Sequence, residues 1–183
     1  MNFYLARHAS PDPDRKDLPY HIPPGPPLST QGLSEAGELA DFLYSKEVRH
    51  FISSPLERCL TTAQIAAQRC AENVLVNPDL MEVQPGESNA DISSRMCRSF
   101  EQACLDFNQD SPFAFFTHGT PIAVLLRSLG MDAEVLKHFC VFDTGNPLPP
   151  AGVWEAEQKN SGGTWEFTLV FTPSTQQNQR IPT

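Results

Sequence analysis

The sequence has few basic residues and no long apolar run. It contains 13 Lys and Arg against 22 Asp and Glu, which gives a net charge of -9. Nucleic acids and anionic membranes are bound by clustered Lys and Arg, so we expect neither as a partner. No apolar run is long enough to cross a bilayer, and no signal-peptide pattern opens the chain. These absences predict a cytoplasmic protein.

Cysteine is also scarce, and its pattern excludes several kinds of site. The five cysteines are odd in number and no two form a CxxC pair, so we interpret them as reduced, partly buried thiols: Cys59, Cys70, Cys97, Cys104 and Cys140. None has an arginine six positions later, as the loop of tyrosine phosphatases requires. The carboxylates of Asp12, Asp14 and Asp17 have no matching His and Asp set elsewhere, so no metal is expected.

Proline concentrates in residues 12–27, DPDRKDLPYHIPPGPP. Each proline removes a backbone donor and restrains the residue before it, so this segment is predicted to be a loop. Long loops of this kind are often substrate lids, although an extended surface segment is an equally good interpretation.

Elsewhere, short apolar runs alternate with amphipathic segments. Helices are predicted over 34–45 with Ser34 as cap, from a capping box at 54–57, over 91–107, and from Thr120 to a stop at Gly130. Strands are predicted at 3–6, 50–53, 73–76 and 113–116, and a hairpin over 151–171 turning at Gly162 and Gly163. This alternation predicts a three-layer α/β fold with a mainly parallel sheet. We expect one catalytic domain over 1–172 and a flexible tail over 173–183.

Several polar residues follow the ends of these predicted strands. Arg7 and His8 end the first strand, Arg58 follows the second, and His118 with Gly119 ends the run 113–116. The carboxyl ends of parallel strands meet at one edge of a sheet, where ligands bind. Two arginines suit phosphate oxygens, and two imidazoles supply a nucleophile and a further donor. The pattern favours phosphoryl transfer.

Five motifs add a resemblance to a known family. They are LARHAS at 5–10, PLSTQGLSEAG at 27–37, SSPLERCLTTA at 53–63, DLMEVQPGE at 79–87 and FFTHGTPIAVLL at 115–126. In this order they resemble the histidine phosphatase superfamily, whose best-known members are the cofactor-dependent phosphoglycerate mutases. The resemblance implies the phosphoglycerate mutase-like fold.

The resemblance also implies roles for particular residues. His8 would be the nucleophile that attacks phosphorus, and Arg7, Arg58 and His118, with Gly119 beside them, would hold the phosphoryl group. Glu82 would protonate the leaving oxygen and later activate water, although the nearby Glu87 remains an alternative. No cofactor and no metal are expected.

The chain departs from the family pattern in several places. Ala9 stands where glycine is commonest, which is tolerable if its φ is negative, and an asparagine often seen several residues later is missing. The segment at 144–146, TGN, matches a further pocket segment only loosely. Only 35 residues separate Glu82 from His118, too few for the helical cap insert of the mutases.

These observations predict a phosphatase that hydrolyses a phosphomonoester through a phosphohistidine on His8. The expected partner is a small phosphorylated substrate or a phosphoprotein, and the oligomeric state is not predicted. A protein phosphohistidine phosphatase is the first alternative. A mutase-type phosphotransferase is less favoured, because a short insert shields the phosphoenzyme poorly from water. A non-catalytic phosphate-binding module is the remaining alternative.

Overall fold

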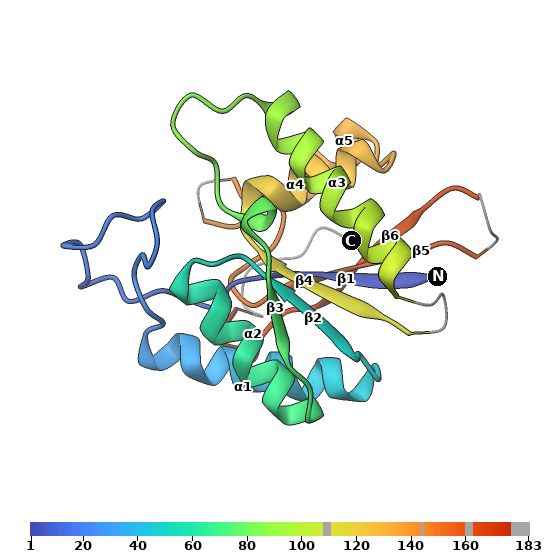
Figure 1. The fold of residues 1–183 in the computed structure, drawn as a ribbon. Helices are drawn as coiled ribbons and strands as arrows, with labels where there is room; N and C mark the ends of the chain where they lie inside the picture. The colour runs from blue at the N-terminus through green and yellow to red at the C-terminus, as the bar shows by residue number, and fades with distance from the viewer. Residues whose placement is uncertain (108–110, 144, 160–162, 177–183) are drawn as a thin grey trace.

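A six-stranded, mostly parallel sheet forms the centre of the computed structural model, which describes residues 1–107, 111–143, 145–159 and 163–176 (Figure 1). The strand order is β3-β2-β4-β1-β5-β6. The parallel strands are β1 (Asn2–Arg7), β2 (His50–Ser53), β3 (Val74–Val76) and β4 (Phe113–Thr117). The expected hairpin is confirmed, because β5 (Val153–Glu157) pairs antiparallel with both β1 and β6 (Glu166–Phe171). Its turn at Gly162 lies outside the described residues.

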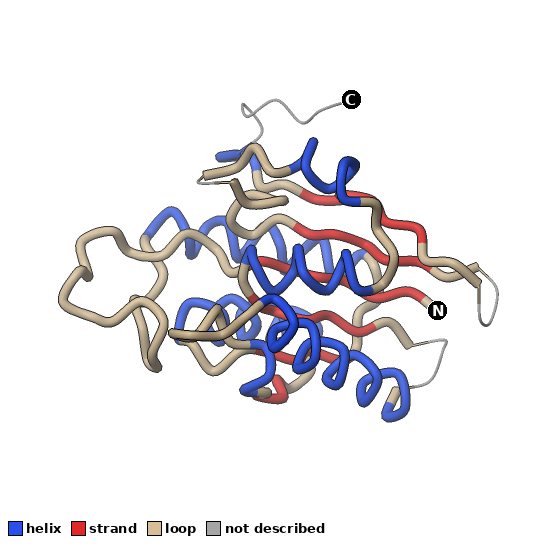
Figure 2. The backbone as a smooth tube through the Cα atoms, turned by 90° about the horizontal axis from the view of Figure 1, so that it is seen from above, coloured by secondary structure: helices blue, strands red, loops and turns tan. Residues whose placement is uncertain are grey.

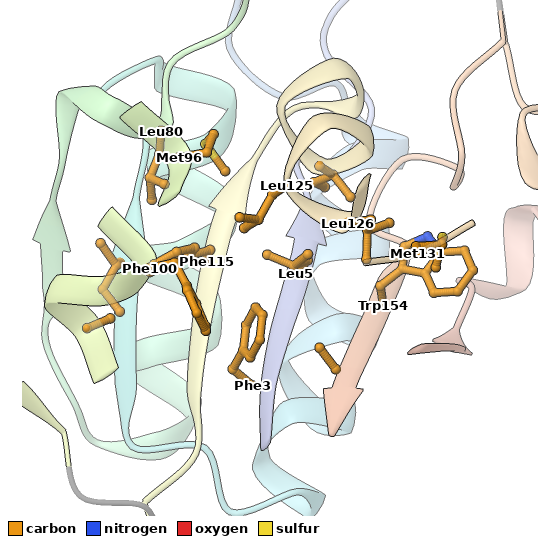
Figure 3. Packing of buried hydrophobic residues seen from close by; sticks show 14 of the residues in the cluster. Phe3, Leu5, Leu80, Met96, Phe100, Phe115, Leu125, Leu126, Met131 and Trp154 are labelled. Carbon is orange, nitrogen blue, oxygen red and sulfur yellow. The ribbon is translucent and has the colours of Figure 1, made fainter. Parts of the chain in front are cut away.

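Helices cover both faces of the sheet, as the three-layer prediction requires. One face carries α1 (Thr30–Ser45) and α2 (Glu57–Cys70), and the other carries α3 (Asn89–Asp106), α4 (Gly119–Ser128) and α5 (Ala133–Phe139) (Figure 1). Alternate β1 side chains enter opposite cores, because successive residues of a strand point to opposite faces. Phe3 and Leu5 pack under α3 and α4 (Figure 3), whereas Tyr4 and Ala6 face α1 and α2.

Two predicted helix starts are wrong, and each had been placed at a serine. Ser34 lies inside α1, which begins at Thr30 because the side chain of Ser29 accepts a hydrogen bond from the Gly32 amide at 3.0 Å. The predicted capping box at 54–57 does not form. α2 begins at Glu57 without a side-chain cap, and the Ser54 hydroxyl accepts from the Leu56 amide at 3.3 Å and lies 3.0 Å from His118 Nε2.

The remaining helix boundaries differ less from the expectation. α3 begins at Asn89 rather than Asp91, because Ser88 forms a capping box with Asp91. α4 begins one residue before Thr120, and Gly130, with φ +106°, follows its end. The sequence analysis missed α5, since its seven residues are too few to show a helical period.

The end of the chain and the cysteines complete the fold. Residues 174–176 form a short 3-10 turn, and Ser174 bonds to Glu38 of α1 at 2.7 Å. The rest of the expected tail lies outside the described residues. All five cysteines are free, and Cys59 and Cys70 are buried, as expected. In the described ranges, no helix combines the length and apolar character that a membrane span needs.

Candidate active site

The end of β1 is fixed by neighbours on both sides. The backbone N–H of His8 donates to Thr117 O of β4 at 3.1 Å, and its carbonyl accepts from the Ala151 amide at 3.1 Å. The Arg7 amide bonds to Gly152 O at 3.0 Å. The loop after β1 is held to α1, because the Ser10 amide donates to Glu35 at 2.8 Å. These contacts leave the His8 backbone little freedom to move.

The side chain of His8 is buried and electrically neutral. Its Nδ1 lies 2.8 Å from Ala9 O, and a carbonyl can only accept, so Nδ1 carries the hydrogen. Burial above all, and then the charges of Arg7 and Arg58, hold the pKa of His8 well below its ordinary value. Nε2 therefore keeps a lone pair at neutral pH, which is the state that a nucleophile needs.

Ala9 fits its place after His8. It is not among the non-glycine residues with positive φ, so no left-handed conformation is required of it. Its amide donates to Thr62 Oγ1 at 3.1 Å, and its methyl group is buried against α1 and α2. The replacement of glycine by alanine is therefore compatible with this backbone.

Arg58 is a fully buried cation without a carboxylate partner in the part of the chain that the structure describes. Its Nη1 donates to Tyr20 O at 2.9 Å, and its guanidinium carbon lies 4.0 Å from the centre of the Tyr20 ring. Nε of Arg58 and Nε of Arg7 are buried and have no hydrogen-bond partner. A buried charge and two unpaired N–H donors are costly unless an anion compensates them. This arrangement suits a phosphate.

His118 faces His8 from the end of β4, with 5.2 Å between ring centres. Its Nδ1 lies 3.2 Å from Nη2 of Arg58, which can only donate, so Nδ1 accepts and Nε2 donates to Ser54 Oγ at 3.0 Å. Burial first, and then the electrostatic influence of the His8 imidazole and of the Arg58 and Arg7 guanidiniums, hold the pKa of His118 well below its ordinary value. In this arrangement His118 orients Arg58.

The two candidate acids have different surroundings. The side chain of Glu82 is 13% exposed, and its Oε2 lies 3.8 Å from His118 Nδ1. Glu87 instead forms a two-point ion pair with Arg95, at 2.5 Å and 3.0 Å, and accepts from the Gln84 amide. The structure places Glu82 near His118, whereas Glu87 holds the loop before α3.

A cavity of about 580 Å³ opens beside Arg7 and Glu82. Tyr20 and His21 of the proline-rich segment line it, and Gln84 Nε2 bonds to His21 O at 3.2 Å. Figure 1 shows this segment as the blue loop beside the start of α2, and Figure 2 shows the long loops gathered at one end of the sheet. The segment therefore borders the site, as a lid would.

Two further residues line this cavity: Asp143, which was not predicted from the sequence, and Asn146. Asp143, with φ +44°, forms an ion pair with Arg7 Nη1 at 2.6 Å, and Asn146 comes from the segment that matched only loosely. A Cβ atom on Gly119 would lie 1.7 Å from Asn146 Oδ1, so glycine there allows the amide to approach. No sequence signal links Asp143 with Arg7, because 136 positions separate them. Thr144 lies outside the described residues.

Metal ligands do not gather at this site. Among the residues that the structure describes, no three His, Cys, Asp or Glu side chains are grouped in a way that could hold a metal ion. Independence from metals stays a prediction.

Comparisons with known sequences point to one family. Residues 3–86 match the histidine phosphatase superfamily (branch 1). The probable phosphoglycerate mutase GpmB of Proteus mirabilis is 38% identical over 60 residues, which cover 33% of this chain and 28% of the relative. GpmB of Escherichia fergusonii is 27% identical over 141 residues, with 58% of this chain and 65% of the relative covered. The chain thus matches less than two thirds of the length of either relative.

Solved structures show the same fold at low identity. A mycobacterial glucosyl-3-phosphoglycerate phosphatase in complex with VO3 has a TM-score of 0.76 at 18% identity, covering 92% of this chain and 97% of its own. A phosphoserine phosphatase of Entamoeba histolytica scores 0.68 at 17% identity, covering 91% and 94%. A phosphoglycerate mutase of Bacillus anthracis scores 0.71 at 15% identity, covering 93% and 92%. Residues 3–86 are therefore similar to the histidine phosphatase superfamily, and the chain shares the fold of these phosphatases and mutases.

Proposed function

We propose that this protein hydrolyses a phosphomonoester through a phosphohistidine formed on His8. One observation carries the proposal. The neutral, buried imidazole of His8 has its Nε2 lone pair free and lies beside two arginines whose Nε–H groups have no partner. A nucleophile in a pocket built for an anion is the arrangement that phosphoryl transfer requires.

The first step forms a bond between His8 Nε2 and phosphorus while the bond from phosphorus to the ester oxygen breaks. Arg7 and Arg58 compensate the charge on the equatorial oxygens. Glu82 gives its proton to the leaving oxygen, which departs as an alcohol. In the second step a water attacks phosphorus, Glu82 accepts its proton, and the P–N bond breaks to release phosphate and restore neutral His8.

The region between Glu82 and His118 favours hydrolysis over transfer. Its described elements are α3 and β4, and both pack into the core of the domain. Neither element is an inserted helical cap over the cavity. A mutase needs such shielding, because its phosphoenzyme must be kept from water. We also propose the cytoplasm as the location, which the acidic composition and the free thiols support.

The test is rapid-quench labelling with a labelled phosphomonoester. Wild type is expected to carry protein-bound phosphate that is acid-labile and alkali-stable, and His8→Ala is expected to carry none and to lose turnover. His138→Ala, at an exposed histidine, serves as the matched control and should label normally. Equal labelling of His8→Ala would assign the nucleophile elsewhere, and tight phosphate binding without any label would favour the binding module.

A further inference from the structure

The lining of the cavity beside Arg7 contains more acidic than basic side chains, although the proposed substrate is an anion. Arg7 is the one Lys or Arg among its described lining residues, and Glu82 and Asp143 contribute two carboxylates. The remaining lining side chains are uncharged, except that His21 becomes a cation when protonated. A second anionic group on a substrate would therefore meet no dedicated cation in this lining.

Asp143 lies at the rim of this cavity. Its Oδ2 accepts from Arg7 Nη1 at 2.6 Å, while Nε of the same guanidinium is buried and has no partner. Asp143 has 40% of its side chain exposed, against 9% for Arg7. The exposed part of the Asp143 carboxylate can therefore contact a second cation while it stays paired with Arg7.

The charges of the assembled site leave one negative charge unbalanced. Arg7 and Arg58 together match a phosphate dianion, and Glu82 is neutral when it holds the proton for the leaving oxygen. The carboxylate of Asp143 then shares the charge of Arg7 with the bound phosphate. A cationic group on the leaving alcohol would restore the balance, whereas a carboxylate there would be repelled.

The same geometry fixes where that cationic group would be. The Arg7 guanidinium bonds to Asp143 through Nη1, and its unpartnered Nε is the donor that the proposed function assigns to the phosphate. The two sites are therefore separated by about the width of that group. A spacer of about two carbons between the ester oxygen and the cationic group matches this separation.

We propose that the substrate is a short phosphomonoester whose alcohol carries an ammonium group, and that Asp143 recognises this group. The inference rests on the proposed function, because it concerns the leaving group of that reaction. It assigns Asp143 a role in specificity, and it disfavours phosphoglycerate-type substrates, whose carboxylate would face Asp143.

The test compares three phosphomonoesters that differ mainly in the terminal group: phosphoethanolamine, n-propyl phosphate and phosphoglycolate. For wild type we expect kcat/KM to fall in that order, with about a tenfold or larger ratio between the first and the last, the size expected for a charge pair near the surface. Asp143→Asn should reduce this ratio to about one third or less of its wild-type value. Asp41→Asn is the matched control, because it removes the same charge from an exposed ion pair with Arg69 and should leave the ratio unchanged.

The outcomes separate this inference from the proposed function. Preferred turnover of phosphoglycolate, or an equal loss on all three esters in Asp143→Asn, would overturn the specificity role while phospho-His8 still forms. In the second case Asp143 would only position Arg7. Failure of the proposed function would show instead as no turnover of any ester and no label on His8.

Discussion

The site has two parts that are built in different ways: a buried part, which we call the floor, and the loop residues around the cavity, which we call the wall. The floor consists of His8, Arg58 and His118, whose exposed fractions are 1%, 0% and 0%. The wall consists of loop residues that line the cavity and are more exposed than the floor: Tyr20, His21, Glu82, Asp143 and Asn146. Floor residues stand on strand ends and on a helix, whereas wall residues come from three separate loops.

This difference separates chemistry from selectivity. Parallel pairing places Arg7 of β1 opposite Thr117 of β4, and Ser53 of β2 opposite Phe116, so the floor follows from the register of the sheet. Side chains on such elements are held more rigidly than side chains on loops. We therefore expect floor substitutions to remove turnover and wall substitutions to change which esters react.

Among the substitutions that test this difference between floor and wall, we expect the largest effect at Glu82, the proposed acid. Glu82→Gln should slow hydrolysis of alkyl phosphates about 100-fold, because their alkoxide must be protonated as it leaves. Nitrophenyl phosphate should be slowed far less, because its leaving group needs little protonation. The measurement is kcat/KM for both esters with each enzyme.

Glu87→Gln is the matched control. It breaks the partly buried ion pair with Arg95, so we expect a loss of about 2 kcal/mol in unfolding free energy with an unchanged ratio between the two esters. A selective loss on alkyl phosphates in Glu87→Gln, and none in Glu82→Gln, would transfer the role of the acid to Glu87.

The next effect concerns the floor and its pH dependence. The pKa values of His8 and His118 lie well below 6.5 in the folded state, so below about pH 6.5 the unfolded chain binds protons at these positions that the folded chain does not. Stability therefore falls as the pH falls from that value, by up to about 1.4 kcal/mol per pH unit for each histidine. Above pH 6.5 the contribution of these groups is constant.

Urea unfolding between pH 5 and 7.5 measures this contribution. The double variant His8→Gln/His118→Gln should show a shallower loss of stability on acidification than wild type, whereas His138→Gln should follow wild type. Parallel curves for wild type and the double variant would mean that the floor histidines do take up protons in the folded state.

The smallest effect concerns the anchor between α1 and the loop that follows His8. Ser29 caps α1 and also donates to Ser10 O at 3.2 Å, so Ser29→Ala should lower the unfolding free energy by about 1 kcal/mol. Ser34→Ala, inside the same helix and exposed, should change stability by less than about 0.5 kcal/mol. Thermal or urea unfolding of both variants shows whether Ser29 or Ser34 caps the helix. A larger loss of unfolding free energy in Ser34→Ala than in Ser29→Ala would contradict the structure.

Local patterns were enough to predict the floor. His8 and His118 each follow a short apolar run, and Arg58 follows a third, so the rule that parallel strands end at one edge places them together. Helix starts were less predictable. Ser54 looked like a cap in the sequence, but its hydroxyl is used by His118, which lies 64 positions away.

The sequence alone determined the fold class, most of the alternation of strands and helices along the chain, and which side chains end those strands. These features depend on hydrophobic periodicity and on short motifs, which are local properties of the chain. Only the tertiary structure decided the wall: the ion pair of Asp143 with Arg7, the Tyr20 ring over Arg58, and the separation of Glu82 from Glu87. The physical reason is that loop side chains have no periodic pattern, so their partners are fixed by contacts between distant parts of the chain.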